Sequence, residues 1–247
     1  SEPIMRIMIT GATSGIGQSL AIDYAQQGHQ VIACGRNPDK LQALVDSHET
    51  DLSHPSITPL CFDLTDYHNF PELNQNEPLD LLILNAGDCE YIDDPINFDA
   101  ELFERVININ LISIGYALKS WLKNIKPDGR LVLVSSSASF LPLPRAEAYG
   151  ASKAALTYLG RTLSVDLAKH NIHVSIVHPG FVETPLTERN SFSMPMIISS
   201  EAATQRIVKG IAQGKSEIDF PRRFIMLMKL LRMLPTSVWQ KLASRMV

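Results

Sequence analysis

The sequence is poor in the residues that mark disulfide-rich and metal-binding proteins. Its 247 residues include only three cysteines, Cys34, Cys61 and Cys89, and no two of them stand at metal-ligand spacing. The number is odd and each cysteine lies in or beside an apolar run, so we expect buried, reduced thiols rather than a disulfide framework. None of the seven histidines belongs to a ligand-like cluster, and no metal is expected.

A basic excess and a long uncharged apolar run are also missing. Lys and Arg total 22 against 26 Asp and Glu, which gives a net charge of −4 and disfavours a nucleic-acid partner. The stretch that comes closest to a membrane span, Phe224 to Leu234, is interrupted by Lys229 and Arg232. The N-terminal sequence SEPIMRIMITG enters a strand-and-glycine pattern almost at once, without room for a targeting segment, so we expect a cytoplasmic protein.

Short apolar runs alternate with longer amphipathic ones along most of the chain. The apolar runs predict strands at Ile4–Thr10, Gln30–Cys34, Ile57–Phe62, Leu79–Leu84, Arg130–Ser135 and Ile172–Val177. The amphipathic runs predict helices at Ile16–Gln27, Pro38–His48, Val106–Lys123 and Glu147–His170. Because the strand runs are nearly continuous rather than alternating, both faces of the sheet should be buried. We therefore predict a single α/β domain with a doubly wound parallel sheet, in which ligands bind at the carboxyl ends of the strands.

A glycine-rich turn, TGATSGIG, follows the first strand and covers Thr10 to Gly17. Its glycines, Gly11, Gly15 and Gly17, allow positive φ angles and a close approach of backbone to a ligand. The helix N-terminus beyond them offers free N–H groups to a pyrophosphate. An ordinary tight turn remains the alternative, whereas a triphosphate loop is disfavoured because no Lys-Ser/Thr pair follows the glycines.

The second strand ends in Gly35 and Arg36, and no acidic residue lies between Val31 and Pro38. An acid near this point usually accepts hydrogen bonds from the ribose of a cofactor that lacks a 2′-phosphate. A guanidinium can instead pair with a 2′-phosphate and stack on adenine. Arg36 therefore indicates NADP(H) rather than NAD(H), with a solvated surface arginine as the alternative.

Tyr149 and Lys153 stand four residues apart and share one face of a predicted helix. A phenol near an ammonium suits proton transfer, although a Y-x-x-x-K pair alone is a weak signal and also occurs on protein surfaces. Asn108 and Asn110 lie in an otherwise apolar helix, where a buried amide must find partners.

Taken together, these motifs resemble the classical short-chain dehydrogenase/reductase family from Ile4 to about Thr187. The glycine spacing is G-x-x-x-G-x-G, Asn85–Gly87 reads N-A-G, and Asn110 precedes a leucine in its helix. Ser136 lies thirteen residues before Tyr149, and P-G-x-x-x-T begins at Pro179. The glycine spacing and the chain length both disfavour the extended branch with its epimerases.

The resemblance implies an NAD(P)-dependent oxidoreductase acting on CH–OH or C=O groups, with a Rossmann-type catalytic domain over 1–220 and no required metal. Tyr149 would be the acid/base, and Lys153 would lower its pKa and hold the nicotinamide ribose. Ser136 would donate to the substrate oxygen, and Asn110 would anchor a water that connects Lys153 to solvent. A regulator that binds NADP(H) without turnover is the alternative function.

The resemblance also implies which residues hold the cofactor. Asp63 would receive the adenine amino group, although a helix N-cap is a rival role for it. The backbone at Val182 and the hydroxyl of Thr184 would hold the carboxamide. The full set is Gly11, Thr13, Ser14, Gly15, Ile16, Gly17, Arg36, Asp63, Leu64, Asn85, Ala86, Gly87, Tyr149, Lys153, Pro179, Gly180, Val182 and Thr184. Family members are commonly homodimers or homotetramers, and we expect the same here.

The loop after Thr184 predicts the kind of substrate. It carries Phe192, Met194, Met196, Ile197 and Ile198, and the segment Leu141–Leu143 is apolar as well. We expect a hydrophobic ketone, aldehyde or secondary alcohol, with simple packing of a lid as the alternative.

The segment 221–247 departs from most members of the family and is expected to form a helical extension of the same domain. It holds six basic residues and no acidic one: Arg222, Arg223, Lys229, Arg232, Lys241 and Arg245. Such a segment could lie on an anionic membrane surface, pack against a partner subunit or cover the substrate pocket.

Overall fold

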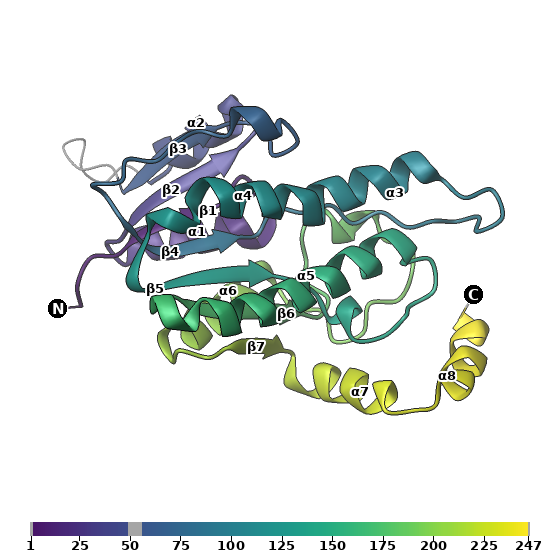
Figure 1. The fold of residues 1–247 in the computed structure, drawn as a ribbon. Coiled ribbons are helices and arrows are strands. Elements are labelled where there is room, and N and C mark those ends of the chain that lie inside the picture. The colour runs from purple at the N-terminus through teal and green to yellow at the C-terminus, as the bar shows by residue number, and fades with distance from the viewer. Residues whose placement is uncertain (1, 49–55, 247) are drawn as a thin grey trace.

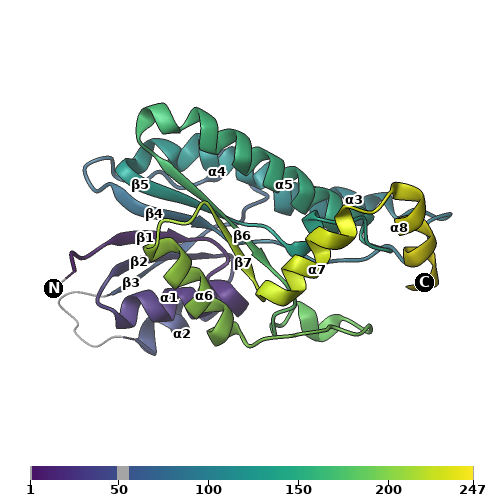
Figure 2. The same ribbon diagram turned by 90° about the horizontal axis from the view of Figure 1, so that it is seen from below.

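A computed structural model describes residues 2–48 and 56–246, which form three layers with a sheet in the middle (Figures 1 and 2). All seven strands are parallel, in the order β3-β2-β1-β4-β5-β6-β7. They are β1 (Arg6–Ile9), β2 (Gln30–Gly35), β3 (Ile57–Cys61), β4 (Leu79–Leu84), β5 (Ile125–Val134), β6 (His173–Pro179) and β7 (Glu217–Phe220). The predicted doubly wound α/β domain is confirmed.

Helices cover both faces of the sheet, as continuous apolar strands require. One face carries α1 (Gly15–Gln26), α2 (Pro38–Asp46) and α6 (Ser200–Ala212), which bury Leu20, Leu41 and Ile207 in one core with residues of β1, β2, β6 and β7. The other face carries α4 (Ser113–Trp121) and α5 (Glu147–Asp166), which bury Trp121 and Leu156 against β4 and β5. These two cores hold the strand ends rigidly in place.

The predicted helix over Val106–Lys123 is not a single α-helix. The chain forms α3 (Ala100–Ile107), a π-helical turn over Asn108–Ile112, and then α4. The helix begins earlier than expected because Asp99 caps it, accepting a hydrogen bond from the Leu102 N–H. The turn coincides with Asn110, whose buried amide bonds to a neighbouring loop.

The sequence patterns missed two elements, β7 and α6. Strand β7 has only four residues, EIDF, too few to stand out as an apolar run. Short 3₁₀ turns also occur along the chain, at Tyr67–Asn69, Leu122–Asn124, Ser137–Ser139, Ala168–His170, Thr187–Arg189 and Ser244–Met246.

The C-terminal segment forms two helices, α7 (Arg222–Arg232) and α8 (Thr236–Ala243), separated at Pro235. They lie at the end of the molecule toward which the strands point (Figures 1 and 2). Their inner faces form a separate small core of Phe140, Leu141, Phe224, Ile225, Met228 and Trp239. The Trp239 indole N–H donates to the Pro142 carbonyl at 2.9 Å, which fixes α8 to the loop after β5. Within residues 2–48 and 56–246, no helix combines the length and apolarity needed to cross a membrane.

The three cysteines are free thiols, and one expectation about them was wrong. Cys34 is buried and Cys89 half-buried, but Cys61 is exposed because β3 lies at the edge of the sheet. In the described part of the chain, no group of three His, Cys, Asp or Glu side chains could hold a metal ion.

Candidate active site

A cavity of about 1100 Å³ opens at the carboxyl ends of the strands. It runs between the segments that follow β1, β2, β3, β4, β5 and β6. It brings together every residue predicted to be catalytic or to hold the cofactor except Gly17 and Asn110: Gly11, Thr13, Ser14, Gly15, Ile16, Arg36, Asp63, Leu64, Asn85, Ala86, Gly87, Ser136, Tyr149, Lys153, Pro179, Gly180, Val182 and Thr184.

The turn after β1 needs its glycines for close packing. Gly11 has a φ of +63°, and a Cβ there would lie 2.9 Å from the Ala86 Cα. A Cβ on Gly17 would collide with the Gly11 carbonyl oxygen, so Gly17 shapes the turn without lining the cavity. No side chain caps α1 at Ser14, which leaves the first backbone N–H groups of that helix available to an anion.

Asn85 joins the end of β4 to the end of β1. Its backbone N–H donates to the Thr10 hydroxyl at 3.0 Å, and its side-chain amide lies 3.3 Å from the carbonyls of Thr10 and Gly11. These bonds fix the floor of the cavity beside the glycine turn.

The far end of the cavity is lined by Arg36, Lys40 and Asp63. Asp63 accepts hydrogen bonds from the backbone N–H of Thr65 at 2.8 Å and from its hydroxyl at 2.7 Å, which lowers the pKa of the carboxyl. The rival role of Asp63 as a helix N-cap is wrong, because it closes a turn and no helix starts there. The sequence interpretation missed Lys40. A basic residue in the first turn of a helix is disfavoured by the helix dipole. The position of Lys40, four residues after Arg36, was the signal that could have identified it.

Ser136, Tyr149 and Lys153 meet at the other end of the cavity. Ser136 is held after β5 by a hydrogen bond from the Ala138 N–H to its hydroxyl at 3.1 Å. Lys153 is buried, donates to the Val134 carbonyl at 3.0 Å, and has its ammonium 5.9 Å from the centre of the Tyr149 ring. One strand end and two turns of α5 therefore place a hydroxyl, a phenol and an ammonium together.

Burial dominates the protonation of this group. It raises the pKa of Tyr149, and a hydrogen bond from Ser136 opposes that rise only in part. Burial also lowers the pKa of Lys153, to about 8. We expected Lys153 to lower the pKa of Tyr149. The protein chain by itself does not show this lowering. The protein by itself keeps the phenol protonated, in the form that donates a proton.

Asn110 lies behind the cavity wall, and Gly87 separates it from the lysine. A Cβ on Gly87 would lie 3.1 Å from the Asn110 Oδ1 and 3.4 Å from the Lys153 Nζ. The Asn110 amide donates to the Asp88 carbonyl at 2.8 Å and the Ser152 hydroxyl at 3.0 Å, and accepts from the Asp88 N–H at 2.7 Å. The Asn110 side chain is thus hydrogen-bonded to groups of this chain behind the cavity wall. Asn108, in contrast, lines the cavity.

Aromatic rings lead away from Tyr149 toward the C-terminal helices. Tyr91 lies 6.5 Å from Tyr149 between ring centres and 5.2 Å from Phe192. Phe181 in turn contacts Phe192 at 6.1 Å and Phe224 of α7 at 5.7 Å. The sequence interpretation missed Tyr91, which lies in a loop without a motif.

Leu141 and Leu143 pack against the C-terminal helices, which supports the packing alternative for that segment.

Charged side chains missed by the sequence interpretation line the rim of the same cavity: Asp88, Glu101, Glu104, Arg105 and Arg189. Burial raises the pKa of Asp88, and the nearby charge of Glu90 raises it further. Beside them, the Cys89 thiol points to the Tyr91 hydroxyl at 3.3 Å.

A chain of hydrogen bonds runs from β7 across β6 to α5. Asp219 Oδ1 lies 2.8 Å from His178 Nδ1, and His178 Nε2 lies 3.1 Å from the Thr157 hydroxyl. The Thr157 and Ser135 hydroxyls are 2.7 Å apart, and Ser135 donates to the Lys153 backbone carbonyl at 3.0 Å. This chain connects the end of β7 to the helix that carries Lys153.

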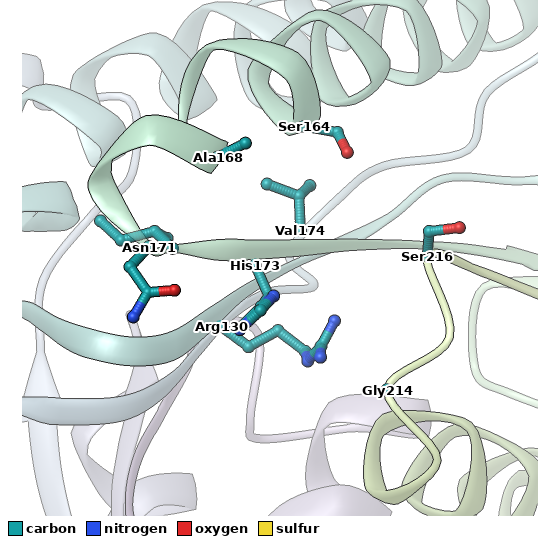
Figure 3. A pocket seen from close by; sticks show the side chains of 9 residues that line it. Arg130, Ser164, Ala168, Asn171, His173, Val174, Gly214 and Ser216 are labelled. Carbon is teal, nitrogen blue, oxygen red and sulfur yellow. The ribbon is translucent and has the colours of Figure 1, made fainter.

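A second hollow, of about 210 Å³, lies at the opposite end of the sheet, where β6 and β7 begin (Figure 3). Arg130 and His173, which are neighbours on β5 and β6, line it with Asn171 and Ser216. The Arg130 guanidinium already donates to the Ser175 hydroxyl at 2.9 Å. None of the predicted site residues lines this hollow, so the large cavity is the candidate active site.

Comparison with known proteins gives one family. Residues 5–195 match the family described as short chain dehydrogenase. An uncharacterized oxidoreductase of Myxococcus xanthus is 32% identical over 97% of this chain and 96% of its own length. An 11-beta-hydroxysteroid dehydrogenase A of Sesamum indicum is 29% identical over 88% of this chain and 68% of its own length.

Solved structures agree on the fold. A short chain dehydrogenase/reductase of Burkholderia phymatum in complex with NAD has a TM-score of 0.79 and 18% identity, covering 92% of each chain. A short-chain dehydrogenase of Sphingobium yanoikuyae in complex with NADPH has a TM-score of 0.74 and 22% identity, covering 95% of this chain and 98% of that one. The chain thus belongs to the short-chain dehydrogenase/reductase family, the oxidoreductases that act on CH–OH and C=O groups with a nicotinamide cofactor.

Proposed function

We propose that the chain transfers hydride between NADP(H) and an apolar carbonyl or alcohol substrate. The observation that carries the proposal is the meeting of Ser136, Tyr149 and Lys153 in one cavity with the glycine turn. A non-catalytic regulator would need the glycine turn but no buried proton donor beside a serine hydroxyl.

The residues fit a dinucleotide. Uncapped N–H groups at the start of α1 suit a pyrophosphate, and the buried Lys153 has two further ammonium hydrogens besides the one bonded to Val134. Lys153 would use them to hold the nicotinamide ribose. When bound, the nicotinamide supplies or accepts the hydride.

The chain's own residues then handle the substrate oxygen. Tyr149 would donate its proton to that oxygen during reduction and take it back during oxidation. Ser136 would hold the oxygen by a hydrogen bond, since its hydroxyl is fixed by the Ala138 N–H. The Lys153 ammonium, 5.9 Å from the centre of the Tyr149 ring, would favour the phenolate that remains after the proton has left.

The preference for NADP(H) rests on Arg36 and Lys40, which line the same end of the cavity. Two cations there suit a 2′-phosphate, and the end of β2 carries no carboxylate to accept from a free 2′-hydroxyl. Solved relatives hold NAD in one case and NADPH in another, so relatedness does not decide between them.

The apolar substrate rests on the rings of Tyr91, Phe181 and Phe192, which extend from Tyr149. A relative named as a hydroxysteroid dehydrogenase fits a bulky apolar skeleton of this kind. The charged rim of the cavity would then face cofactor phosphates, solvent or a polar end of the substrate.

The decisive experiment compares Tyr149→Phe with Tyr158→Phe, which changes an exposed tyrosine on the same helix. With an apolar ketone and NADPH, Tyr149→Phe should lower kcat about 10²- to 10⁴-fold while the Kd for NADPH changes little. Tyr158→Phe should leave both unchanged. Full turnover in Tyr149→Phe would contradict the assignment, and no turnover in the wild type together with tight NADPH binding would favour the regulator.

The cofactor preference has its own test. Fluorescence titration should give tighter binding of NADPH than NADH, and Arg36→Leu should weaken NADPH binding about 10- to 100-fold. The NADH Kd should stay the same in that variant. Tighter NADH binding by the wild type would show that Arg36 does not bind a phosphate.

The prediction of a homodimer or homotetramer stays open to measurement. Tyr158 and Val165, seven residues apart on α5, are 77% and 75% exposed and form one apolar stripe. Light scattering on the purified chain should give a mass of two or four copies, and Val165→Glu should reduce it.

A further inference from the structure

The outer surface of α7 and α8 is unusually apolar. Seven of the fifteen large hydrophobic side chains that are exposed in the described structure lie on these two helices or in the residues that follow each of them. They include Met226, Leu230 and Met233, at 67%, 64% and 82% exposure. The others are Leu227, Val238, Leu242 and Met246. This part of the molecule, which we term the C-terminal face, therefore has apolar surface that folding does not bury.

The exposed residues form stripes rather than a scatter. Met226, Leu230 and Met233 follow the i, i+4, i+7 pattern of one helix face, and Val238, Leu242 and Met246 repeat every four residues along α8 and the turn after it. The opposite face of α7 is already packed, because Phe224, Ile225 and Met228 belong to the small C-terminal core. A helix that is apolar on two faces needs a second apolar surface to cover it.

The charge of this segment indicates what that surface is. Residues 221–246 contain six basic and no acidic side chains. Lys229 is paired with Asp219 at 2.8 Å, which leaves Arg222, Arg223, Arg232, Lys241 and Arg245 exposed among the apolar stripes. Two copies of the chain joined symmetrically through this face would bring like charges together, which is destabilising. A surface with an apolar interior and negatively charged outer groups would match both the exposed apolar stripes and the basic side chains.

We propose that the C-terminal face docks onto an anionic lipid surface, with its apolar stripes in the headgroup and acyl boundary and its basic side chains at the headgroups. This goes beyond the proposed oxidoreductase activity and does not depend on it. The face lies at the same end of the molecule as the carboxyl ends of the strands (Figures 1 and 2). An apolar substrate would then reach the cavity from a lipid phase.

The position of α7 is fixed by the body of the protein and not by the proposed membrane. The Trp239 indole holds α8 to Pro142, and Phe224 contacts Phe181. Substituting an outward-facing residue should therefore leave the fold intact. The residues that hold the C-terminal helices in place thus differ from those proposed to contact the membrane, so single substitutions can test the proposal.

The experiment is co-sedimentation of the full chain with two kinds of vesicle, one of phosphatidylcholine alone and one with phosphatidylglycerol added. Leu230→Glu changes the apolar stripe, and Ile96→Glu is the matched control, because Ile96 is 88% exposed but lies in a loop outside this face. Circular dichroism and thermal melting verify that both variants are folded. Kd for NADPH is measured in parallel.

We expect binding to the anionic vesicles, weaker binding to the neutral ones, and release by salt. Leu230→Glu should abolish binding and Ile96→Glu should leave it unchanged, while Arg232→Gln should weaken it about fivefold. An absence of binding at low ionic strength would overturn the proposal, as would equal loss in both Glu variants. A wild-type dimer that Leu230→Glu converts to a monomer, without vesicle binding, would show that the face is a subunit interface.

Discussion

The two ends of the candidate site are built in different ways. The end proposed to hold the cofactor is shaped by backbone: Gly11 and Gly15 have positive φ angles, and added Cβ atoms at Gly11 and Gly17 would meet neighbouring main chain. Beyond Tyr149, toward the C-terminal helices, the surroundings of the site are formed by side chains from distant segments, such as Tyr91, Phe192 and Phe224, which do not themselves line the cavity. One end depends on glycine spacing within a single turn, and the other on packing between loops far apart in sequence.

This difference determines how each end responds to substitution. Where backbone meets backbone, a single added methyl group has no space and the neighbouring chain cannot move independently. Where side chains meet, a loss of volume can be accommodated by neighbouring residues, so the cost falls on substrate contacts rather than on the fold. The cofactor end should therefore be intolerant of small changes, and the substrate end should be adjustable.

The largest effect is expected for Gly17→Ala. The new Cβ would collide with the Gly11 carbonyl oxygen, so we expect a loss of about 2–3 kcal/mol or more in the free energy of unfolding. Gly115→Ala is the control, because Gly115 lies in α4 with no atom within 4 Å of an added Cβ, and it should be neutral or stabilise by up to about 1 kcal/mol. Denaturant titration measures both. Equal stability of the two variants would show that the turn after β1 tolerates an added methyl group.

A smaller effect of opposite sign is expected for Lys153→Met. Burial lowers the pKa of Lys153 to about 8 from its ordinary value of 10.5, so the charged lysine destabilises the fold. The full shift corresponds to about 3 kcal/mol, and the lost hydrogen bond to Val134 reduces the gain. We therefore expect the variant to be more stable by about 1–3 kcal/mol while losing turnover.

The pH dependence of this gain identifies its cause. Because the pKa of Lys153 is lower in the folded than in the unfolded state, the charged lysine destabilises the fold to the full extent below pH 8. This destabilisation disappears as the pH rises toward 10.5. The stability gain of Lys153→Met should shrink over the same interval in urea titrations. Lys119→Met, which changes an exposed lysine of α4, should show neither the gain nor its pH dependence. A gain that persists unchanged above pH 10.5 would assign it to packing.

At the substrate end, Phe192→Ala should raise KM for an apolar ketone about tenfold, with a smaller change in kcat. The ring contacts Tyr91 and Phe181, and its removal takes apolar surface from the region beside Tyr149 without reaching the glycine turn. Met196→Ala is the matched control in the same loop, because Met196 is 48% exposed. A change in the Kd for NADPH would mean that the two ends of the site are not separate.

The sequence predicted most of the residues that line the end proposed for the cofactor, because the backbone requirements of that end leave a local sequence pattern. A turn that requires glycine at fixed positions, and a helix that presents Tyr149 and Lys153 on one face, leave a local pattern that can be recognised. Of the residues predicted to be catalytic or to hold the cofactor, only Gly17 and Asn110 do not line the cavity, and both lie directly behind its wall. The sheet followed from continuous apolar runs, except for the four-residue β7.

The substrate end could not be predicted in the same way. Tyr91 lies in a loop without a local signal, and its meeting with Phe192 depends on how two loops fold over the sheet. Leu141 and Leu143 are apolar like substrate-binding residues, but they pack against the C-terminal helices. The pKa of Tyr149 also differed from expectation, because sequence spacing indicates the neighbouring lysine but not the degree of burial.

The smallest effect is expected where the C-terminal helices join the buried chain behind β6. Burial would raise the pKa of Asp219, but hydrogen bonds from His178 and Lys229 outweigh it and lower that pKa below the ordinary value of 3.8. Lys229 itself is 48% exposed, so Lys229→Met should cost no more than about 1 kcal/mol at pH 7. Lys241→Met on α8 is the exposed control.

The sign of the pH dependence tests whether this ion pair is the cause. A lowered carboxyl pKa gives stability that is present above the unfolded value and is lost as the pH falls through the folded one. The difference between wild type and Lys229→Met should therefore be constant near neutral pH, begin to shrink below about pH 4 and vanish once the pH lies below the folded pKa of Asp219. Turnover should be unaffected, because Lys229 reaches Lys153 only through Asp219, His178, Thr157 and Ser135. A change in the pH profile of kcat would show that the C-terminal helices influence the catalytic lysine, and the two regions would then act as one.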